Sequence, residues 1–243
     1  MKQTRLDSLL VKRGMAKSRQ RAKALIEAQQ VVVNGKLARK ASVMCDPDVD
    51  IHMESPDIPW VSRAGLKLEK ALRKWSIDVS EAVCLDIGAS TGGFTEVLLY
   101  NGAQKVYALD VGHGNLDGRL REDPRVVVME KRNIRDADGS WFSGQFDIIT
   151  VDISHISLKY AMPKIAEFLS PEGEAVALIK PQFEVGKEHI GKGLVRDPVL
   201  HEKAIEAVRM FAEEAGLVSV EVTESPIDGV AGNREFLLHL KRR

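Results

Sequence analysis

The spacing of apolar residues divides the chain into two parts with different secondary structure. In the first part, apolar side chains recur at helical spacing over residues 5–13 and again over residues 18–28. Three valines, an Asn-Gly pair and a Lys-Leu pair over residues 31–37 predict a β-hairpin with a type I′ turn. A further strand is expected near residues 49–53. These elements predict a small α+β domain at the N-terminus.

The second part alternates short apolar runs with helical stretches. Helices are expected from residue 62, after residue 95 and over residues 198–216. The run at residues 83–87 is nearly continuous, as expected for a strand that is buried on both faces. The runs expected as strands cover residues 83–87, 105–110, 125–129, 146–152, 173–180, 217–224 and 233–240. This alternation predicts an α/β fold class.

A short proline-containing stretch separates the two parts. Residues 54–61 hold two prolines and two acids, which disfavour both helix and strand and favour a stiff, extended connection. We therefore expect an N-terminal domain at residues 1–53, a linker at residues 54–61 and a larger domain at residues 62–243.

The net charge of zero conceals an uneven distribution of charge. Residues 1–44 carry eleven Lys and Arg and two Asp and Glu, a balance of +9, so the remaining residues carry −9. A small basic domain on an acidic protein indicates a polyanionic partner for that domain. A basic surface with no partner is the alternative.

Composition indicates a soluble globular protein. Hydrophobic residues make up 44% of the chain, and no apolar run approaches the ~20 residues that a membrane span needs. The N-terminus lacks the apolar core of a signal peptide. The two cysteines, Cys45 and Cys84, fall in different predicted domains, so we expect reduced thiols and a cytoplasmic protein.

A glycine-rich turn in the second part is the strongest candidate site. Residues 84–95 read Cys-Leu-Asp-Ile-Gly-Ala-Ser-Thr-Gly-Gly-Phe-Thr: a buried strand, a turn and the start of a helix. Glycines let the backbone approach a ligand, and a helix N-terminus offers unpaired N–H groups. The spacing is neither the G-x-G-x-x-G of dinucleotide-binding folds nor that of a P-loop. An ordinary tight turn is the alternative.

The motif Asp-x-Gly-x-Ser-x-Gly-Gly-Phe, from Asp86 to Phe94, resembles the first motif of S-adenosylmethionine-dependent methyltransferases, particularly the FtsJ-like ribose methyltransferases. The resemblance implies a Rossmann-like sheet with an antiparallel edge strand, formed by residues 233–240, and S-adenosyl-L-methionine as cofactor. Strand ends are also ligand sites in such sheets. The implied cofactor-binding residues are Asp86, Gly88, Ala89, Ser90, Gly92, Gly93, Phe94, Asp110, Asn133, Ile134 and Asp152. For Asp110, which could bind the adenosine ribose, a helix or turn cap is the alternative.

The N-terminal part resembles the alpha-L RNA-binding motif. The matching residues are Arg5-Leu6-Asp7, Gly14, Ser18-Arg19-x-x-Ala22, Leu25-Ile26 and Val31-x-Val33-Asn34-Gly35. The resemblance implies an RNA-binding domain, and the candidate contacts are Arg5, Arg19, Arg21, Lys23 and Lys36. Because no aromatic residue precedes Trp60, phosphate and shape contacts are favoured over base stacking. A domain that only packs on the rest of the protein is the alternative.

Taken together, the chain resembles the TlyA family, also called hemolysin A, over nearly all of its 243 residues. The resemblance implies methylation of ribose 2′-hydroxyls in ribosomal RNA, typically at cytidine, with ribosomal RNA or ribosomal subunits as partners. The four polar residues of such active sites match Lys67, Asp152, Lys180 and Glu235, and Lys67 lies within Ser-Arg-Ala-x-x-Lys-Leu. His155 stands where an aromatic residue is expected, which leaves the lining of the pocket open.

The chemistry of methyl transfer to a ribose explains these residue types. A ribose hydroxyl is a weak nucleophile and must lose its proton during attack. A lysine, with a free pKa of about 10.4, needs burial or a neighbouring cation to act as the base. We hypothesise that Lys180 is the base, that Asp152 positions it, and that Lys67 and Glu235 hold the ribose. No metal is required, because the sulfonium of the cofactor already makes its methyl group electrophilic.

Three other functions remain open at the level of sequence. The chain could be a non-catalytic RNA-binding or ribosome-assembly factor, which loss of one of the four polar residues would have favoured. It could be a membrane-active hemolysin, against which the absence of an apolar span argues. It could methylate a base or a protein, although the sequence has no Asn/Asp-Pro-Pro-aromatic motif. The oligomeric state is not predicted.

Overall fold

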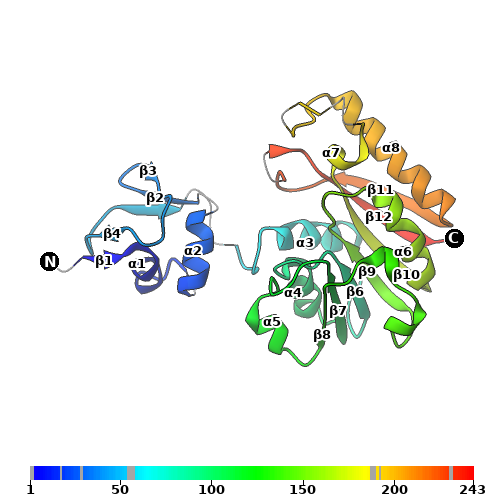
Figure 1. Ribbon diagram of the computed structural model, residues 1–243, viewed down its shortest axis with the longest axis horizontal. Helices are drawn as coiled ribbons and strands as arrows, with labels where there is room; N and C mark the ends of the chain where they lie inside the picture. The colour runs from blue at the N-terminus through cyan, green and yellow to red at the C-terminus, as the bar shows by residue number, and fades with distance from the viewer. Residues whose placement is uncertain are drawn as a thin grey trace. The chain divides into compact units, whose positions relative to one another are not determined.

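The computed structural model divides into two compact units (Figure 1). Contacts within the chain group Met1–Pro59 into one unit and Trp60–Arg243 into the other. Residues 54–57 of the predicted linker lie outside the residues that the structure describes. The described residues are 3–16, 18–27, 30–53, 58–186, 190–191, 193–229 and 232–243.

The N-terminal unit is the predicted small α+β domain. The hairpin turn has positive φ angles at Asn34 (48°) and Gly35 (72°), as a type I′ turn requires. A second, two-stranded sheet, in which Thr4 pairs with Cys45, was not predicted, because two-residue strands carry no alternation of polar and apolar positions. The elements are β1 (Thr4–Arg5), α1 (Leu6–Lys12), α2 (Arg19–Glu27), β2 (Val31–Val33), β3 (Lys36–Leu37), β4 (Met44–Cys45) and β5 (Ile51–Met53).

The helical spacing of apolar residues accounts for the core of this unit. Both helices bury the faces on which their leucines and isoleucine lie. The buried apolar side chains described in the two helices are Leu6, Leu9, Leu10, Ala22, Leu25 and Ile26. The valines of β2 close the core from the sheet side.

A buried carboxylate organises two of the basic residues of the N-terminal unit. Asp7 accepts hydrogen bonds from Arg5 at 3.1 and 2.8 Å and from Arg19 at 3.1 Å. These bonds, first those from Arg5, hold the pKa of the Asp7 carboxyl well below its usual range despite its burial. The two arginines are therefore held together by a residue of the RNA-binding motif to which the sequence analysis gave no role of its own.

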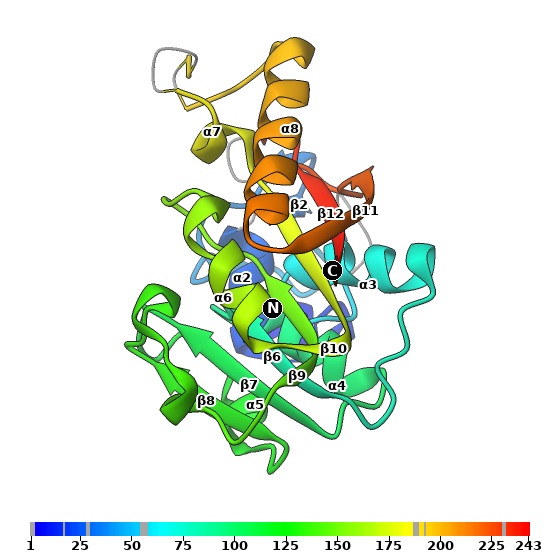
Figure 2. The ribbon, with the colours of Figure 1, turned by 90° about the vertical axis from the view of Figure 1, so that its right-hand side faces the viewer.

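The larger unit is the predicted Rossmann-like sheet with helices on both sides (Figures 1 and 2). Its seven strands have the order β11-β12-β10-β9-β6-β7-β8, and the five strands from β10 to β8 are mutually parallel. The strands are β6 (Val83–Ile87), β7 (Lys105–Asp110), β8 (Val126–Glu130), β9 (Phe146–Val151), β10 (Leu169–Ile179), β11 (Leu217–Glu224) and β12 (Phe236–Arg242).

The sequence analysis expected the antiparallel strand at the edge of the sheet. In the structure this strand, β12, lies inside the sheet. β12 pairs antiparallel with β10 on one side and with β11 on the other, so β11 is the edge strand. The burial of the two strands explains the difference. Leu237, Leu238 and Leu240 of β12 are fully buried, whereas most residues of β11 are partly or fully exposed. A strand that is buried on both faces belongs inside the sheet.

Helices α3 (Ala64–Trp75), α4 (Gly93–Tyr100) and α5 (Gly118–Glu122) cover one face of the sheet, and α6 (Met162–Phe168) and α8 (Pro198–Glu214) cover the other (Figure 2). Alternate strand residues face the two layers: Cys84 packs with the first group of helices, and Leu85 packs with the second. The short helix α7 (Pro181–Glu184) directly follows β10. The carboxyl ends of β6, β9 and β10 therefore lie side by side, since the three strands are parallel neighbours.

We expect Asp7→Asn to destabilise the N-terminal unit by about 1–3 kcal/mol at pH 7, because two arginines lose their shared carboxylate. The depressed pKa of Asp7 means that its contribution is present above its ordinary pKa of 3.8 and is lost as the pH falls. Hydrogen exchange of the α1 amides, followed by mass spectrometry, reports on this unit alone. The exposed Asp48, changed to Asn, is the matched control. Equal protection in the two variants would contradict the prediction.

Candidate active site

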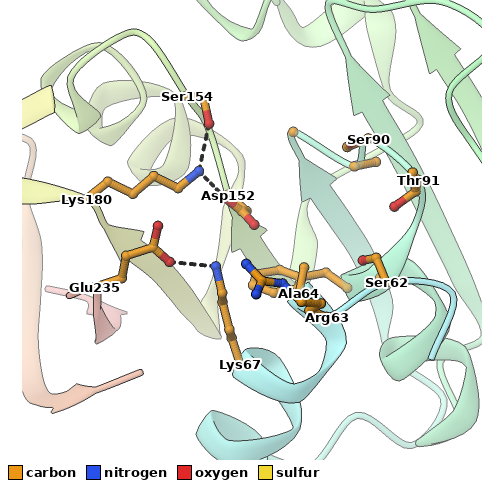
Figure 3. A pocket seen from close by; sticks show the side chains of 14 residues that line it. Ser62, Arg63, Ala64, Lys67, Ser90, Thr91, Asp152, Ser154, Lys180 and Glu235 are labelled. Atoms are coloured by element: carbon orange, nitrogen blue, oxygen red, sulfur yellow. Dashed lines mark hydrogen bonds and ion pairs between the residues drawn. The ribbon is translucent and has the colours of Figure 1, made fainter. Parts of the chain in front are cut away.

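A pocket of about 280 Å³ lies at the carboxyl ends of β6, β9 and β10 (Figure 3). One side is formed by the glycine-rich turn between β6 and α4, and the other by charged side chains from α3 and from the strand ends. Its lining residues are Ser62, Arg63, Ala64, Lys67, Gly88, Ala89, Ser90, Thr91, Gly93, Phe94, Asp152, Ser154, Lys180 and Glu235. Ligand sites in open α/β sheets occur at this edge.

The structure brings the four predicted catalytic residues together as two ion pairs (Figure 3). Lys67 Nζ of α3 lies 2.5 Å from Glu235 Oε2, and Lys180 Nζ lies 2.6 Å from Asp152 Oδ1. Both lysines and Glu235 are buried, with 7%, 9% and 3% of their surface exposed. Buried charges are costly unless they are paired, so each pair fixes the position of both of its members.

A glycine that the sequence analysis did not single out makes room for Glu235. A Cβ atom on Gly229 would lie 2.1 Å from Glu235 Oε1, so only glycine fits there without a shift of the carboxylate. The backbone N–H of Ser225 donates to the carbonyl of Glu235 at 2.8 Å. The segment before β12 therefore fixes the backbone of Glu235 through Ser225 and leaves space for its carboxylate at Gly229.

The glycine-rich turn lies against the strand that carries Asp152. Gly88 has a φ of +86°, and a Cβ there would lie 2.3 Å from the carbonyl oxygen of Asp152. Gly93 and Phe94 begin α4, so their N–H groups have no acceptor within the helix. Of the predicted cofactor-binding residues in this turn, Gly88, Ala89, Ser90, Gly93 and Phe94 line the pocket. Such a backbone cradle at a helix N-terminus suits an anionic ligand group.

Asp86 lies beneath this turn and does not line the pocket. It is fully buried, and it accepts hydrogen bonds from Thr95 Oγ1 of α4 at 2.6 Å and from Thr150 Oγ1 of β9 at 2.9 Å. Burial raises the pKa of its carboxyl to about 6, against the opposing effect of the two hydroxyls. Asp86 therefore connects β6, β9 and α4 and stabilises the base of the turn.

The remaining predicted cofactor residues have structural contacts of their own. Asp110 accepts from the backbone N–H groups of Ser90 at 2.9 Å and Gly112 at 2.6 Å, which is the turn-cap role given as its alternative. Ile134 is buried in the core, and Asn133 caps the short 3₁₀ helix η1 (Ile134–Asp136). Gly92, with a φ of +97°, packs against Leu120, which a Cβ would approach to 2.2 Å.

Ser154 is the polar residue of the pocket that the sequence analysis missed most clearly. Its Oγ lies 2.7 Å from Lys180 Nζ, on the other side of the amine from Asp152 (Figure 3). The sequence did offer a signal for Ser154, because it lies two residues after Asp152, the acid at the end of β9. Ser62, Arg63 and Thr91 also line the pocket without having been predicted.

A second pocket of about 350 Å³ adjoins the first through three shared residues, Ser154, Lys180 and Glu235. It contains an aromatic pair, His155 and Phe183, whose ring centroids are 5.4 Å apart. Its other lining residues are Gln182, Ile190, Gly193 and Asn233. Two ligand groups could therefore meet beside Lys180, one from each pocket.

The five predicted RNA-binding residues all belong to the N-terminal unit. Arg5 and Arg19 share Asp7, as described above, and Arg21 donates to the carbonyl of Ile58 at 3.3 Å. Lys23 of α2 and Lys36 of β3 are exposed. Four of the five thus lie on or next to the two helices, and Lys36 lies on the hairpin.

Among the described residues, no helix is both long and apolar enough to cross a membrane. The same part of the chain contains no group of three or more His, Cys, Asp or Glu side chains arranged to hold a metal ion. Cys45 and Cys84 are buried free thiols, and burial raises the pKa of each.

Two family models match the chain, and their ranges follow the two units. The model described as FtsJ-like methyltransferase matches residues 60–242, and the S4 domain model matches residues 4–51. The first covers the whole sheet and all four residues of the two ion pairs. The second covers both helices of the N-terminal unit.

Full-length relatives combine the same two parts. The 16S/23S rRNA (cytidine-2′-O)-methyltransferase TlyA of Mycobacterium tuberculosis is 44% identical over 99% of this chain and 90% of its own length. The "Putative rRNA methyltransferase YqxC" of Bacillus subtilis is 44% identical over 98% of this chain and 86% of its own. A solved structure, the "Putative hemolysin" from Streptococcus thermophilus, is 43% identical, covers 100% of this chain and 89% of its own, and has a TM-score of 0.79.

We expect Asp86→Asn to remove a pH-dependent cost of folding. The folded-state pKa of Asp86, about 6, lies above its ordinary value of 3.8, so the folded state binds the proton more tightly. The wild type therefore loses stability as the pH rises between these values, by about 3 kcal/mol in total, and the variant does not. The free energy of unfolding of the variant should rise by most of this amount relative to wild type between pH 4 and pH 7.

Urea unfolding followed by tryptophan fluorescence measures this difference. All three tryptophans of the chain, Trp60, Trp75 and Trp141, belong to the larger unit, so the signal excludes the N-terminal unit. A difference between variant and wild type that does not change with pH would contradict the assignment of the raised pKa to Asp86.

Proposed function

Since this chain belongs to the TlyA family of FtsJ-like methyltransferases, we propose that it transfers the methyl group of S-adenosylmethionine to a ribose 2′-hydroxyl of ribosomal RNA. One observation carries the proposal: two lysine–carboxylate pairs, of which both lysines and Glu235 are buried, face a glycine-rich turn across a single pocket. The 2′-hydroxyl of a cytidine is the proposed acceptor, by analogy with the activity for which the relative from Mycobacterium tuberculosis is named.

The pocket residues fit the cofactor. Gly88 and Gly93 leave no room for a side chain of their own, and the free N–H groups at the start of α4 suit the carboxylate of its methionine part. When bound, S-adenosylmethionine supplies an electrophilic methyl group, whose bonding electron pair stays on sulfur as the ribose oxygen takes the carbon. Asp110, Asn133 and Ile134 remain predictions for the adenosine part, since they lie outside the pocket lining.

The two ion pairs have different roles toward the ribose: one removes the proton and the other binds the sugar. Lys180 Nζ takes the proton from the 2′-hydroxyl as that oxygen attacks, and Asp152 holds the amine in place at 2.6 Å. Lys67 and Glu235, paired at 2.5 Å, bind the neighbouring ribose oxygens as donor and acceptor. The second pocket accommodates the base of the same nucleotide, because it shares Lys180 and Glu235 with the first.

The N-terminal unit supplies affinity for RNA. Its basic residues, including Arg5, Arg19, Arg21, Lys23 and Lys36, contact phosphates of folded ribosomal RNA or of a ribosomal subunit. We propose that residues 1–53 form this RNA-binding domain, that residues 54–61 are a linker and that residues 62–243 are the catalytic domain. The protein acts in the cytoplasm, where its substrate is found and where its two buried thiols stay reduced.

Lys180→Ala should reduce methyl transfer by about 10²- to 10⁴-fold, the range lost with a general base, and leave cofactor affinity within about threefold of wild type. Transfer of label from S-adenosylmethionine to unmodified ribosomal subunits measures the first quantity, and equilibrium dialysis measures the second. Lys105→Ala is the matched control and should retain full activity, because Lys105 lies at the amino end of β7, away from the strand ends that form the pocket.

Near-normal transfer by Lys180→Ala would overturn its role as base. Cofactor binding without transfer in the wild type would indicate a different RNA substrate or assembly state. Loss of both in the wild type would instead support a non-catalytic RNA-binding protein.

Gly88→Ala should weaken cofactor binding at least tenfold, about 1.4 kcal/mol, because the added Cβ meets the carbonyl of Asp152 and displaces the turn. Gly216→Ala is the matched control. Its φ of +84° is close to the +86° of Gly88, but nothing lies within 4 Å of its Cβ position. Equilibrium dialysis with labelled cofactor separates the clash from the backbone strain that the two variants share. Equal cofactor affinities of the two variants would contradict the proposal that the turn at Gly88 binds the cofactor.

A further inference from the structure

Lys180 is held by two acceptors that differ in charge. Its Nζ lies 2.6 Å from a carboxylate oxygen of Asp152 and 2.7 Å from the hydroxyl oxygen of Ser154 (Figure 3). Lys67 has a different environment. Within the described part of the chain, its amine makes one such contact, with Glu235.

The number of acceptors decides how well the direction of an amine is defined. A neutral lysine amine is tetrahedral, with bonds to Cε and to two hydrogens and one lone pair. One acceptor leaves the amine free to exchange its second N–H and its lone pair by rotation about the Cε–Nζ bond. Two acceptors engage both N–H groups, so the lone pair is confined to the one remaining direction. Lys180 meets this condition and Lys67 does not.

The backbone after β9 places Ser154 beside Lys180. Asp152 and Ser154 are two residues apart, and His155 follows with a φ of +69°, a left-handed conformation that is costly for any residue except glycine. The chain thereby turns away directly after Ser154. Ser154 lines both pockets, so its hydroxyl stands where the ribose joins the two proposed ligand sites.

We propose that Ser154 is a positioning residue for methyl transfer: its hydroxyl accepts a hydrogen bond from Lys180 and so aims the lone pair of the amine at the ribose 2′-hydroxyl. The proposal rests on the proposed function and adds to it a reason why Lys180, and not Lys67, is the base. In the step itself, the proton of the 2′-hydroxyl passes to Nζ and fills the third N–H position of the ammonium. A neutral acceptor aims the amine without bringing a second negative charge beside Asp152.

Steady-state kinetics of Ser154→Ala and Ser154→Thr test this role. Removing the hydroxyl should lower kcat by about 10- to 100-fold, the loss expected when a reacting group is misdirected, while KM for the RNA and for the cofactor changes less than twofold. Threonine keeps the hydroxyl and should restore kcat to within threefold of wild type. Tryptophan fluorescence during urea unfolding checks that both variants are folded.

The outcomes separate this proposal from the function on which it rests. If the wild type transfers methyl groups and Ser154→Ala keeps its kcat, or changes KM alone, Ser154 does not aim the base and the proposal is overturned while the proposed function stands. Failure of threonine to restore kcat also counts against it, because the hydroxyl would then not be the group that matters. A wild type that neither binds the cofactor nor transfers a methyl group to any ribosomal RNA substrate overturns both.

Discussion

Two lysine–carboxylate pairs in one pocket, with both lysines and Glu235 buried, are the interactions on which the site of the larger unit depends. Removing one partner of a buried pair costs about 3–5 kcal/mol. The fold must therefore bring both members of each pair to the pocket. Lys67 and Glu235 are 168 residues apart in sequence. They meet because β12 inserts beside β10, which brings the segment before β12 to the carboxyl ends of the parallel strands. The insertion of this strand is therefore a requirement of the site as well as of the core.

Much of this arrangement could be predicted, because it follows from local pattern. The strand runs are apolar and short, and parallel strands place their carboxyl ends at one edge, so Asp152 and Lys180 were expected together. The place of β12 in the sheet could not be read in the same way, since pairing between distant strands has no local signal. Its buried Leu237, Leu238 and Leu240 point to an interior strand only once β11 is seen to be more exposed.

The orientation of individual polar side chains was the least predictable feature. Asp86 lies in the motif that resembles a cofactor site, yet Thr95 and Thr150 take up its two oxygens and bury it. Asp86 shares the face of Cys84 by alternation along β6, but which neighbours offer it hydroxyls could not be predicted, because these come from other elements. Asp7 in the N-terminal unit is a parallel case: an acid in a basic segment that is buried and bonded to two arginines.

The most direct measurement of the central claim is the position of the methyl group on the product. Ribosomal subunits that lack the modification are incubated with the protein and labelled S-adenosylmethionine, and the RNA is then hydrolysed with alkali. A methyl group on a ribose 2′-oxygen blocks cleavage of the next phosphodiester bond, so the account predicts that the label appears in an alkali-resistant dinucleotide beginning with cytidine. Label in a mononucleotide, carried on the base, would contradict it.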